Sequence, residues 1–280
     1  MTVTTADGPA LWSGDVQVVW LEFADYLLWL QGKLTHTVTE WGERVRLPKP
    51  WFPGEHWAFV GPTGQGKTTQ VVPILGTRKF VLALDPKGKD TTLSKSGYIR
   101  VEELPARGWR RYSGPDQKTW RKIWRDIDEG KPARVIVGGD RRTTEQAAAL
   151  RDLLDQAIKF AQESEGWTVY VDEFELLSSQ RMMRLADQID DMLIAARDSG
   201  ISVVTAYQAQ AWVSHHASRQ ARKATVWPQS VELLKSVALN MSREWKDVGI
   251  AADRVPAYHS VTIPQGKRGG PMIITAPPEL

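Results

Sequence analysis

Short apolar runs alternate along this chain with longer segments whose apolar residues recur every three or four positions. The runs occupy residues 56–60, 80–84, 135–137, 168–171 and 201–204. Each is too continuously apolar to be half-exposed, which is typical of a buried parallel strand. The segments 147–161 and 182–196 have helical spacing instead. Strands that alternate with helices predict an α/β fold, a mostly parallel sheet covered by helices on both faces, with ligands at the carboxyl ends of the strands.

The most hydrophobic segment, residues 16–30, lies before this alternating region. Glu22 and Asp25 leave it well short of the ~20 apolar residues that a membrane span requires, so no transmembrane segment is expected. Read as a helix, it confines its polar residues to one narrow stripe and leaves a broad apolar face. That face predicts packing on its own domain or docking onto a neighbouring subunit. Sparse basic residues make attachment to a membrane surface the least favoured interpretation.

A proline-rich stretch separates this segment from the first core strand. Residues 47–54 read Leu-Pro-Lys-Pro-Trp-Phe-Pro-Gly, which is typical of a stiff connector. We therefore expect an N-terminal helical arm over residues 1–50 and a core domain over residues 51–280.

The sequence directly after the first core strand fits the phosphate-binding template Gly-x-x-x-x-Gly-Lys-Thr at every fixed position. Its glycines allow successive backbone N–H groups to face phosphates, while Lys67 supplies positive charge and Thr68 a hydroxyl for Mg²⁺. A helix that starts near Lys67 adds its positive N-terminal end. Strand before and helix after argue against a glycine-rich turn without function. The predicted ATP-binding residues are Gly61, Pro62, Thr63, Gly64, Gln65, Gly66, Lys67, Thr68 and Thr69.

Two carboxylates, Asp172 and Glu173, follow the strand at 168–171. We expect Asp172 to hold Mg²⁺ together with Thr68 and water, and Glu173 to polarise the attacking water. The alternative is an acidic pair that caps the next helix, which is favourable at a helix N-terminus. The phosphate loop upstream favours the catalytic interpretation, with Lys67 as the second catalytic residue.

Polar residues also end two other strands. Gln208 follows the strand that begins at residue 201, and its amide suits sensing of a γ-phosphate or orientation of water. An ordinary glutamine at a helix start is the alternative. Asp85 ends its own strand and opens the sequence Asp-Pro-Lys-Gly, for which a turn is the simplest explanation.

Composition limits the possibilities without selecting a function. The chain of 280 residues can bury one large or two small cores, and its 42% hydrophobic and 25% charged residues are ordinary for a globular protein. Cysteine is absent, which excludes disulfides and thiolate metal sites. The first nine residues show no secretory signal, so a cytoplasmic location is expected. A formal net charge of +3 and a pI near 9.0 permit a polyanionic partner.

Four sequence blocks together resemble the FtsK/HerA superfamily of DNA-pumping ATPases, which includes conjugative coupling proteins. They are Gly-Pro-Thr-Gly-Gln-Gly-Lys-Thr from 61, Leu-Asp-Pro-Lys-Gly from 84, Val-Tyr-Val-Asp-Glu from 169, and Ala-Arg-Asp-Ser-Gly-Ile-Ser-Val-Val-Thr-Ala-Tyr-Gln from 196. Their order and spacing agree with the family over roughly residues 55–210. Ala209 and Gln210 depart from it, since family members often carry Arg or Pro directly after the glutamine.

The resemblance implies a RecA-like core, a homo-oligomeric ring expected to be hexameric, and ATP-driven movement along duplex DNA. It also implies that Arg197 reaches the nucleotide of a neighbouring subunit as a trans-acting finger. Because no anchor segment is evident, the chain resembles a stripped-down motor, or one whose membrane or loading partner is another protein.

Two basic tracts are candidates for contact with DNA phosphates. The first, residues 107–125, interleaves Arg110, Arg111, Lys118, Arg121, Lys122 and Arg125 with aromatic residues. A solvated helix with its aromatic side chains in the core is the favoured interpretation there. The second tract, Arg219, Arg222 and Lys223, follows the glutamine strand, where RecA-like proteins place a loop that faces nucleic acid. We expect these three residues to contact DNA.

Three functions remain compatible with the sequence. A ring-forming, DNA-translocating ATPase is favoured. A monomeric P-loop phosphotransferase would need an acceptor pocket and usually an arginine-rich lid. A nucleotide-dependent assembly or export ATPase would use the same site without acting on duplex DNA.

Overall fold

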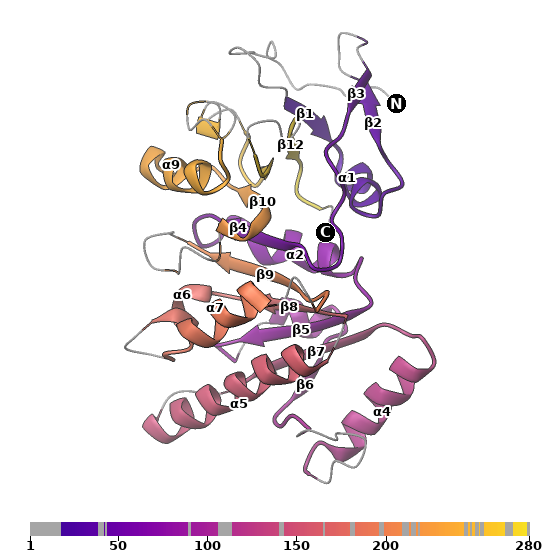
Figure 1. The fold of residues 1–280 in the computed structure, drawn as a ribbon, viewed down its shortest axis with the longest axis vertical. Coiled ribbons are helices and arrows are strands. Elements are labelled where there is room, and N and C mark those ends of the chain that lie inside the picture. Colours follow the sequence, from indigo (N-terminus) through magenta and orange to yellow (C-terminus); the bar gives the residue numbers. More distant parts are fainter. Residues whose placement is uncertain are drawn as a thin grey trace.

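The computed structural model describes residues 18–38, 42, 44–88, 91–105, 114–139, 143–164, 166–179, 183–195, 199–208, 213, 217, 219–243, 246, 248–249, 252, 255–266 and 271–278. Its main feature is a ten-stranded sheet in the order β1-β12-β11-β10-β4-β9-β8-β5-β7-β6, which runs through the middle of the molecule (Figure 1). Adjacent strands are parallel except where β11 runs antiparallel to β10 and β12. The expected α/β fold with a mostly parallel sheet is therefore confirmed.

The strands of this sheet are β1 (Val18–Leu21), β4 (His56–Val60), β5 (Phe80–Asp85), β6 (Ile99–Val101), β7 (Ala133–Gly138), β8 (Trp167–Val171), β9 (Ser202–Tyr207), β10 (Ala221–Val226), β11 (Ser260–Pro264) and β12 (Met272–Thr275). A separate hairpin pairs β2 (His36–Val38) with β3 (Arg44–Arg46). The helices are α1 (Phe23–Leu30), α2 (Lys67–Leu75), α3 (Thr91–Lys95), α4 (Gln117–Asp128), α5 (Thr144–Glu163), α6 (Phe174–Ser178), α7 (Ala186–Ala195) and α9 (Val231–Asn240).

The five strands that the apolar runs predict are β4, β5, β7, β8 and β9, and they are neighbours in the sheet. Successive residues of a strand face opposite sides, so Trp57 and Phe59 join one core cluster while Ala58 and Val60 join the other. Because both faces are covered, these strands read as continuous apolar runs rather than alternating ones.

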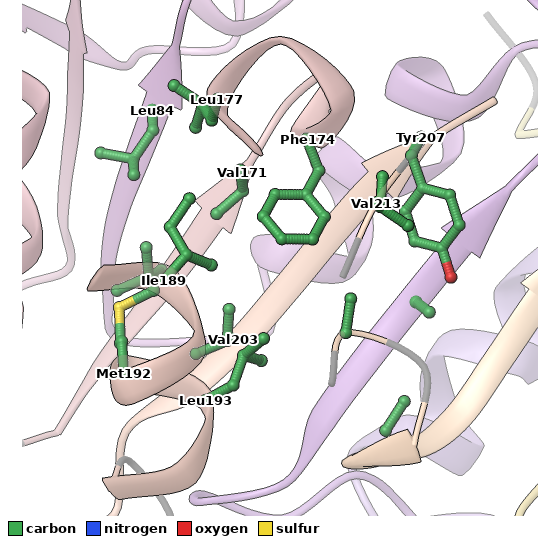
Figure 2. Close-up of a cluster of buried hydrophobic side chains, with 14 of the residues drawn as sticks. Leu84, Val171, Phe174, Leu177, Ile189, Met192, Leu193, Val203, Tyr207 and Val213 are labelled. Atoms are coloured by element: carbon green, nitrogen blue, oxygen red, sulfur yellow. The ribbon is translucent and has the colours of Figure 1, made fainter. Parts of the chain in front are cut away.

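Helices cover each face of the sheet. Residues of α4, α5, α6, α7 and α9 belong to the cluster on one face, and residues of α1, α2 and α3 belong to the cluster on the other. Figure 2 shows part of the first cluster, in which Phe174 of α6 and Met192 of α7 lie close to Val171 of β8 and Val203 of β9. This packing fixes α6 directly after β8.

The register of the central strands brings three strand ends together. Val60, the last residue of β4, pairs with Tyr207, the last residue of β9, and Val171, the last residue of β8, pairs with Thr205. The segments that follow β4, β8 and β9 therefore leave the sheet on the same side, at the carboxyl ends of the strands, where parallel sheets bind ligands.

The N-terminal arm differs from the expected helix over residues 16–30. Residues 18–21 form the edge strand β1, which pairs in parallel with β12 from Val18 beside Met272 to Leu21 beside Thr275. Helix α1 begins only at Phe23. The helical expectation is wrong for residues 18–21 because β-branched and aromatic residues there satisfy their backbone on the open edge of β12.

Helix α1 packs on the core sheet. Tyr26 and Trp29 are buried, and the Tyr26 hydroxyl shares a hydrogen bond of 2.8 Å with Thr262 Oγ1 of β11. Trp29 Nε1 donates to the backbone oxygen of Pro48 at 2.8 Å. These contacts agree with packing of the arm on its own domain, while the domain boundary at residue 50 stays a prediction. Within the described ranges, no helix is both long and apolar enough to cross a membrane.

The second predicted helix is shorter than its apolar spacing suggests. Helix α7 begins at Ala186 rather than near residue 182, because Arg184 adopts a left-handed backbone with φ of 54°. The N–H of Leu185 donates to the oxygen of Leu177, so this segment connects α6 to α7. Met182 and Ala196 lie outside the described residues.

Candidate nucleotide-binding site

The phosphate loop connects the end of β4 to the start of α2. Gly64 and Gly66 have φ of 81° and 83°, a backbone region that glycine adopts without strain. The N–H of Gly61 donates to the oxygen of Tyr207 at 3.2 Å, which fixes the start of the loop beside β9. Helix α2 begins at Lys67, so its N-terminus faces the loop as the sequence predicts.

Lys67 folds back over its own loop. Its Nζ donates to the backbone oxygens of Gly61 at 2.6 Å and Pro62 at 2.9 Å. Burial lowers the pKa of Lys67, and the nearby carboxylates of Glu175, Asp172 and Glu173 oppose that change. An ammonium held by carbonyl oxygens in a partly buried site is ready to exchange them for phosphate oxygens.

A cavity of about 300 Å³ lies beside the loop. Its lining residues come from the loop and α2, from α3, from the turn after β8 and the start of α6, and from the end of β9 with the residue that follows it. They are Thr63, Gly64, Gly66, Lys67, Thr68, Thr69, Thr92, Asp172, Glu173, Glu175, Ala206, Tyr207 and Gln208. The structure thus brings together the predicted loop, the carboxylate pair and Gln208. Gly61, Pro62 and Gln65 are not among the lining residues, and the first two hold Lys67 instead.

The acidic pair occupies the turn between β8 and α6. The Asp172 N–H donates to the oxygen of Leu84 at 3.2 Å, and the buried Tyr170 hydroxyl donates to Asp172 Oδ1 at 2.8 Å. Thr68 and Asp172 both line the cavity, and a hydroxyl and a carboxylate fit Mg²⁺, which prefers oxygen ligands. Their roles as metal ligands stay predictions.

Glu173 has an unusual backbone for a residue with a side chain. Its φ of 46° and ψ of 58° are left-handed, a conformation that costs roughly 1–3 kcal/mol and often marks a functional site. Glu173 caps α6 without a hydrogen bond from its own side chain to the helix. Its carboxylate instead pairs with the ammonium of Lys87.

Lys87 belongs to the Asp-Pro-Lys-Gly sequence, which forms the expected turn. The buried Asp85 carboxylate accepts hydrogen bonds from the N–H groups of Lys87 at 3.1 Å and Gly88 at 2.9 Å, and pairs with Arg100 at 3.1 Å. Gly88 has φ of 68°, and a Cβ there would lie 2.0 Å from the oxygen of Gly139. No local feature of the sequence indicates that this turn presents Lys87 to Glu173.

Glu175 is a further cavity residue that the sequence pattern did not indicate. Burial raises the pKa of its carboxyl, the backbone N–H groups of Glu175 and Gln208 and the charge of Lys67 oppose that change, and Glu173 adds to it. Both carboxylate oxygens are buried, and neither has a hydrogen bond of good geometry to a described residue. A carboxylate three residues after Asp172, in the first turn of α6, is the only sequence signal for it.

The proposed DNA contacts lie at the opposite end of the strands from the phosphate loop. Ala221, the first residue of β10, pairs with His56, the first residue of β4, whereas the phosphate loop follows the last residue of β4. Arg219 and Arg222 are exposed there, and Arg222 Nη1 donates to Gln265 Oε1 at 3.1 Å. Both remain candidates.

Lys223 is not a candidate, which corrects the sequence-based expectation. Its side chain is only 4% exposed, and its Nζ lies 3.4 Å from Glu55 Oε2 and 3.2 Å from the oxygen of Pro50. Burial lowers its pKa, and the charge of Glu55 opposes that change. The register between β10 and β4 shifts between Ala221 and Lys223, so that Lys223 pairs with Trp57 and is buried while Arg222 stays exposed.

Two other candidates fall partly or wholly outside the described residues. Arg197 lies in the undescribed segment 196–198, after the end of α7. In the first basic tract, Arg110 and Arg111 are likewise undescribed. Its described part follows the favoured interpretation, because Trp120 of α4 is buried while the four basic residues of the helix are exposed, namely Lys118, Arg121, Lys122 and Arg125.

Neither a protein-family model nor a curated protein sequence matches this chain. Solved structures do. The genome packaging NTPase B204 from Sulfolobus turreted icosahedral virus 2, in complex with AMP, is similar over 82% of this chain and 100% of that chain, with a TM-score of 0.54 and 15% identity. VirB4 of Thermoanaerobacter pseudethanolicus is similar over 80% of this chain and 89% of its own, with a TM-score of 0.53 and 9% identity.

The bacterial conjugative coupling protein TrwBdeltaN70 is similar over 94% of this chain and 93% of that chain, with a TM-score of 0.51 and 12% identity. At such low identities the likeness establishes the fold. The chain has the RecA-like P-loop fold that the resemblance of its sequence blocks to the FtsK/HerA superfamily implies.

Proposed function

We propose that this protein hydrolyses ATP and uses the energy to move duplex DNA, acting as a homo-oligomeric ring. The observation that carries the proposal is the convergence of the phosphate loop, the Asp172–Glu173 pair and Gln208 on one cavity. A phosphate loop alone supports nucleotide binding, whereas a carboxylate and an amide opposite the loop add the groups that hydrolysis needs.

Each cavity residue has a chemical role in this proposal. The loop N–H groups and the N-terminus of α2 bind the phosphates, and Lys67 exchanges the carbonyls of Gly61 and Pro62 for phosphate oxygens. Thr68 and Asp172 are the residues that would hold Mg²⁺, which supplies positive charge to the phosphates when bound. Glu173 accepts a proton from the attacking water, and Gln208 orients that water or senses the γ-phosphate.

The DNA part of the proposal has separate support. Similar folds occur in a viral genome packaging NTPase and in a conjugative coupling protein. The exposed pair Arg219 and Arg222 offers cationic groups for phosphate contacts. Arg197, placed by the sequence just before β9, is the candidate for a finger that completes a neighbour's site in a ring of six.

The test is the ATP hydrolysis rate with and without duplex DNA, read beside the mass of the protein in the presence of ATP. We expect a ring-sized oligomer whose hydrolysis rises on addition of DNA. A monomer that transfers phosphate to a small acceptor would support a phosphotransferase instead. An oligomer whose rate is indifferent to DNA would support an assembly or export ATPase.

A further inference from the structure

Lys87 and Glu173 form an ion pair across the ends of two neighbouring strands. Glu173 lines the cavity, whereas Lys87 is not among the lining residues and reaches Glu173 from the turn after β5. The two strands are adjacent, with Leu84 beside Val171 in the parallel register of β5 and β8. Lys87 therefore supports Glu173 from outside the cavity.

The turn that carries Lys87 is held firmly in place. Its backbone is fixed by the hydrogen bonds of Lys87 and Gly88 to the buried Asp85, which Arg100 also holds. The close approach of Gly88 to Gly139 leaves no room for a side chain. Because the backbone of Lys87 is held in one position, its ammonium can fix the position of a partner.

Glu173 needs such a partner because its own element does not orient it. Its side chain makes no capping hydrogen bond to α6, and its left-handed backbone turns it away from an ordinary helix position. Among the described residues, Lys87 is the group whose side chain bonds to the Glu173 carboxylate. A general base acts well only when a further group orients it.

The pair acts through the position of the Glu173 carboxylate. The Lys87 and Glu173 side chains are 47% and 20% exposed, and an ion pair in contact with water contributes little electrostatic energy. Misplacing a reacting group by about 1 Å, by contrast, can slow a reaction about 100-fold. The expected effect of the pair is therefore on the orientation of the carboxylate.

We propose that Lys87 is a positioning residue for ATP hydrolysis, which holds the Glu173 carboxylate at the cavity wall where it can accept a proton from the attacking water. This inference rests on the proposed function, because it assumes that Glu173 is the base. In this proposal, the role of the Asp-Pro-Lys-Gly turn is to place the ammonium of Lys87, which follows β5, beside the residue that follows β8.

The test compares steady-state hydrolysis by the full chain, with DNA present, for the parent, Lys87→Met, Lys87→Arg and Lys159→Met. Lys159 is the matched control because it pairs with Asp155 on α5, with side-chain exposures of 64% and 23%. We expect kcat of Lys87→Met to fall by about 10- to 100-fold while KM for ATP stays within about two-fold. Lys87→Arg should recover much of the loss, and Lys159→Met should match the parent.

A double variant shows whether Lys87 acts through Glu173. If it does, Lys87→Met combined with Glu173→Gln should turn over no more slowly than Glu173→Gln alone in a single-turnover measurement. Multiplying defects in the double variant, or a Lys87→Met kcat equal to or above that of the parent, would overturn the proposal. A Glu173→Gln protein that hydrolyses ATP at the parent rate is a distinct result, because it removes the base and with it the proposed function.

Discussion

Three carboxylates and one ammonium share the cavity, and their balance shapes what can bind there. Asp172, Glu173 and Glu175 give the wall an excess of negative charge around Lys67. A triphosphate alone would meet repulsion from that wall, whereas a triphosphate that arrives with Mg²⁺ brings the missing positive charge. At the scale of single residues, we therefore expect the cavity to bind a nucleotide together with its metal.

Glu175 should make stability depend on pH. Burial raises its pKa above the ordinary 4.5, so the folded chain binds this proton more tightly than the unfolded chain. Its contribution to the free energy of unfolding is complete below about pH 4.5 and is lost as pH rises through the folded-state value. Glu175→Gln should therefore be more stable than the parent near neutral pH and lose that advantage in acid. Urea unfolding at a series of pH values measures this, and equal stability at neutral pH would show a solvated carboxylate.

Lys223 and Arg222 should behave differently although they are adjacent. Lys223→Ala removes a buried stem and leaves Glu55, which is 23% exposed, without its partner. We expect a loss of about 2–3 kcal/mol in the free energy of unfolding. Arg222→Ala, the matched control on the exposed side of β10, should cost less than about 1 kcal/mol. Denaturant unfolding of both variants checks the contrast.

For DNA binding we expect the opposite contrast, in which loss of the exposed arginines matters and loss of Lys223 does not. Replacing Arg219 and Arg222 with Ala should reduce the slope of log affinity against log salt by about 0.9 for each DNA phosphate that the protein no longer neutralises. Lys223→Ala should leave that slope unchanged at a temperature where it is folded. A flatter slope for Lys223→Ala would contradict the burial of its ammonium.

At the scale of elements, the sequence predicted the strands and the loop whose positions depend only on the local pattern of residues. The five central strands are buried on both faces, so their apolar runs identify them, and Gly64 and Gly66 mark the loop by spacing alone. Strand β1 escaped prediction because its partner β12 is remote in sequence, and an edge strand and a helix can share the same apolar residues.

The unpredicted part of the site has the same physical origin. Lys87 contacts Glu173 only because β5 and β8 are neighbours in the sheet. The order of strands in a sheet cannot be predicted from the local periodicity of the sequence. Glu175 faces the cavity because of how α6 leaves β8. The loop, Asp172, Glu173 and Gln208 were predictable as a group because each follows the end of a strand of one parallel sheet.

The packing of α1 on the sheet gives an element-scale prediction. A chain of hydrogen bonds joins Trp57 Nε1 to Thr225 Oγ1 at 2.9 Å, Thr225 to Thr262 at 2.9 Å, and Thr262 to Tyr26 at 2.8 Å. Tyr26→Phe should cost about 1–2 kcal/mol, since Thr262 keeps Thr225 as a partner, and Tyr26→Ala about 3–5 kcal/mol. Urea unfolding gives these values, and hydrolysis should be unchanged. A Tyr26→Ala protein as stable as the parent would mean that Tyr26 contributes little to the packing of α1 on the sheet.

At the scale of the whole molecule, the two ends of the sheet have different proposed tasks. The nucleotide cavity lies where β4, β8 and β9 end, and the exposed Arg222 lies where β10 begins. In the proposed function, hydrolysis and DNA contact therefore lie at opposite ends of the paired strands β4 and β10. This arrangement makes assembly central to the proposed function.

Mixed rings test whether sites are shared between subunits. Lys67→Ala and Arg197→Ala should each be inactive alone, because one lacks the phosphate-binding charge and the other the predicted trans-acting arginine. Mixing them should restore some hydrolysis, since a mixed ring contains sites with an intact loop from one subunit and an intact arginine from the next. No recovery in verified mixed rings would make Arg197 a structural residue.

The most direct test of the central claim is ATP binding and ATP turnover measured on the same preparations of Lys67→Ala and Glu173→Gln. We predict that Lys67→Ala loses both, because its charge meets the phosphates. Glu173→Gln should bind ATP as the parent does and turn over about two to four orders of magnitude more slowly, as loss of a positioned general base does. Normal turnover by Glu173→Gln with intact binding would contradict the assignment of this cavity as the site of hydrolysis by Glu173.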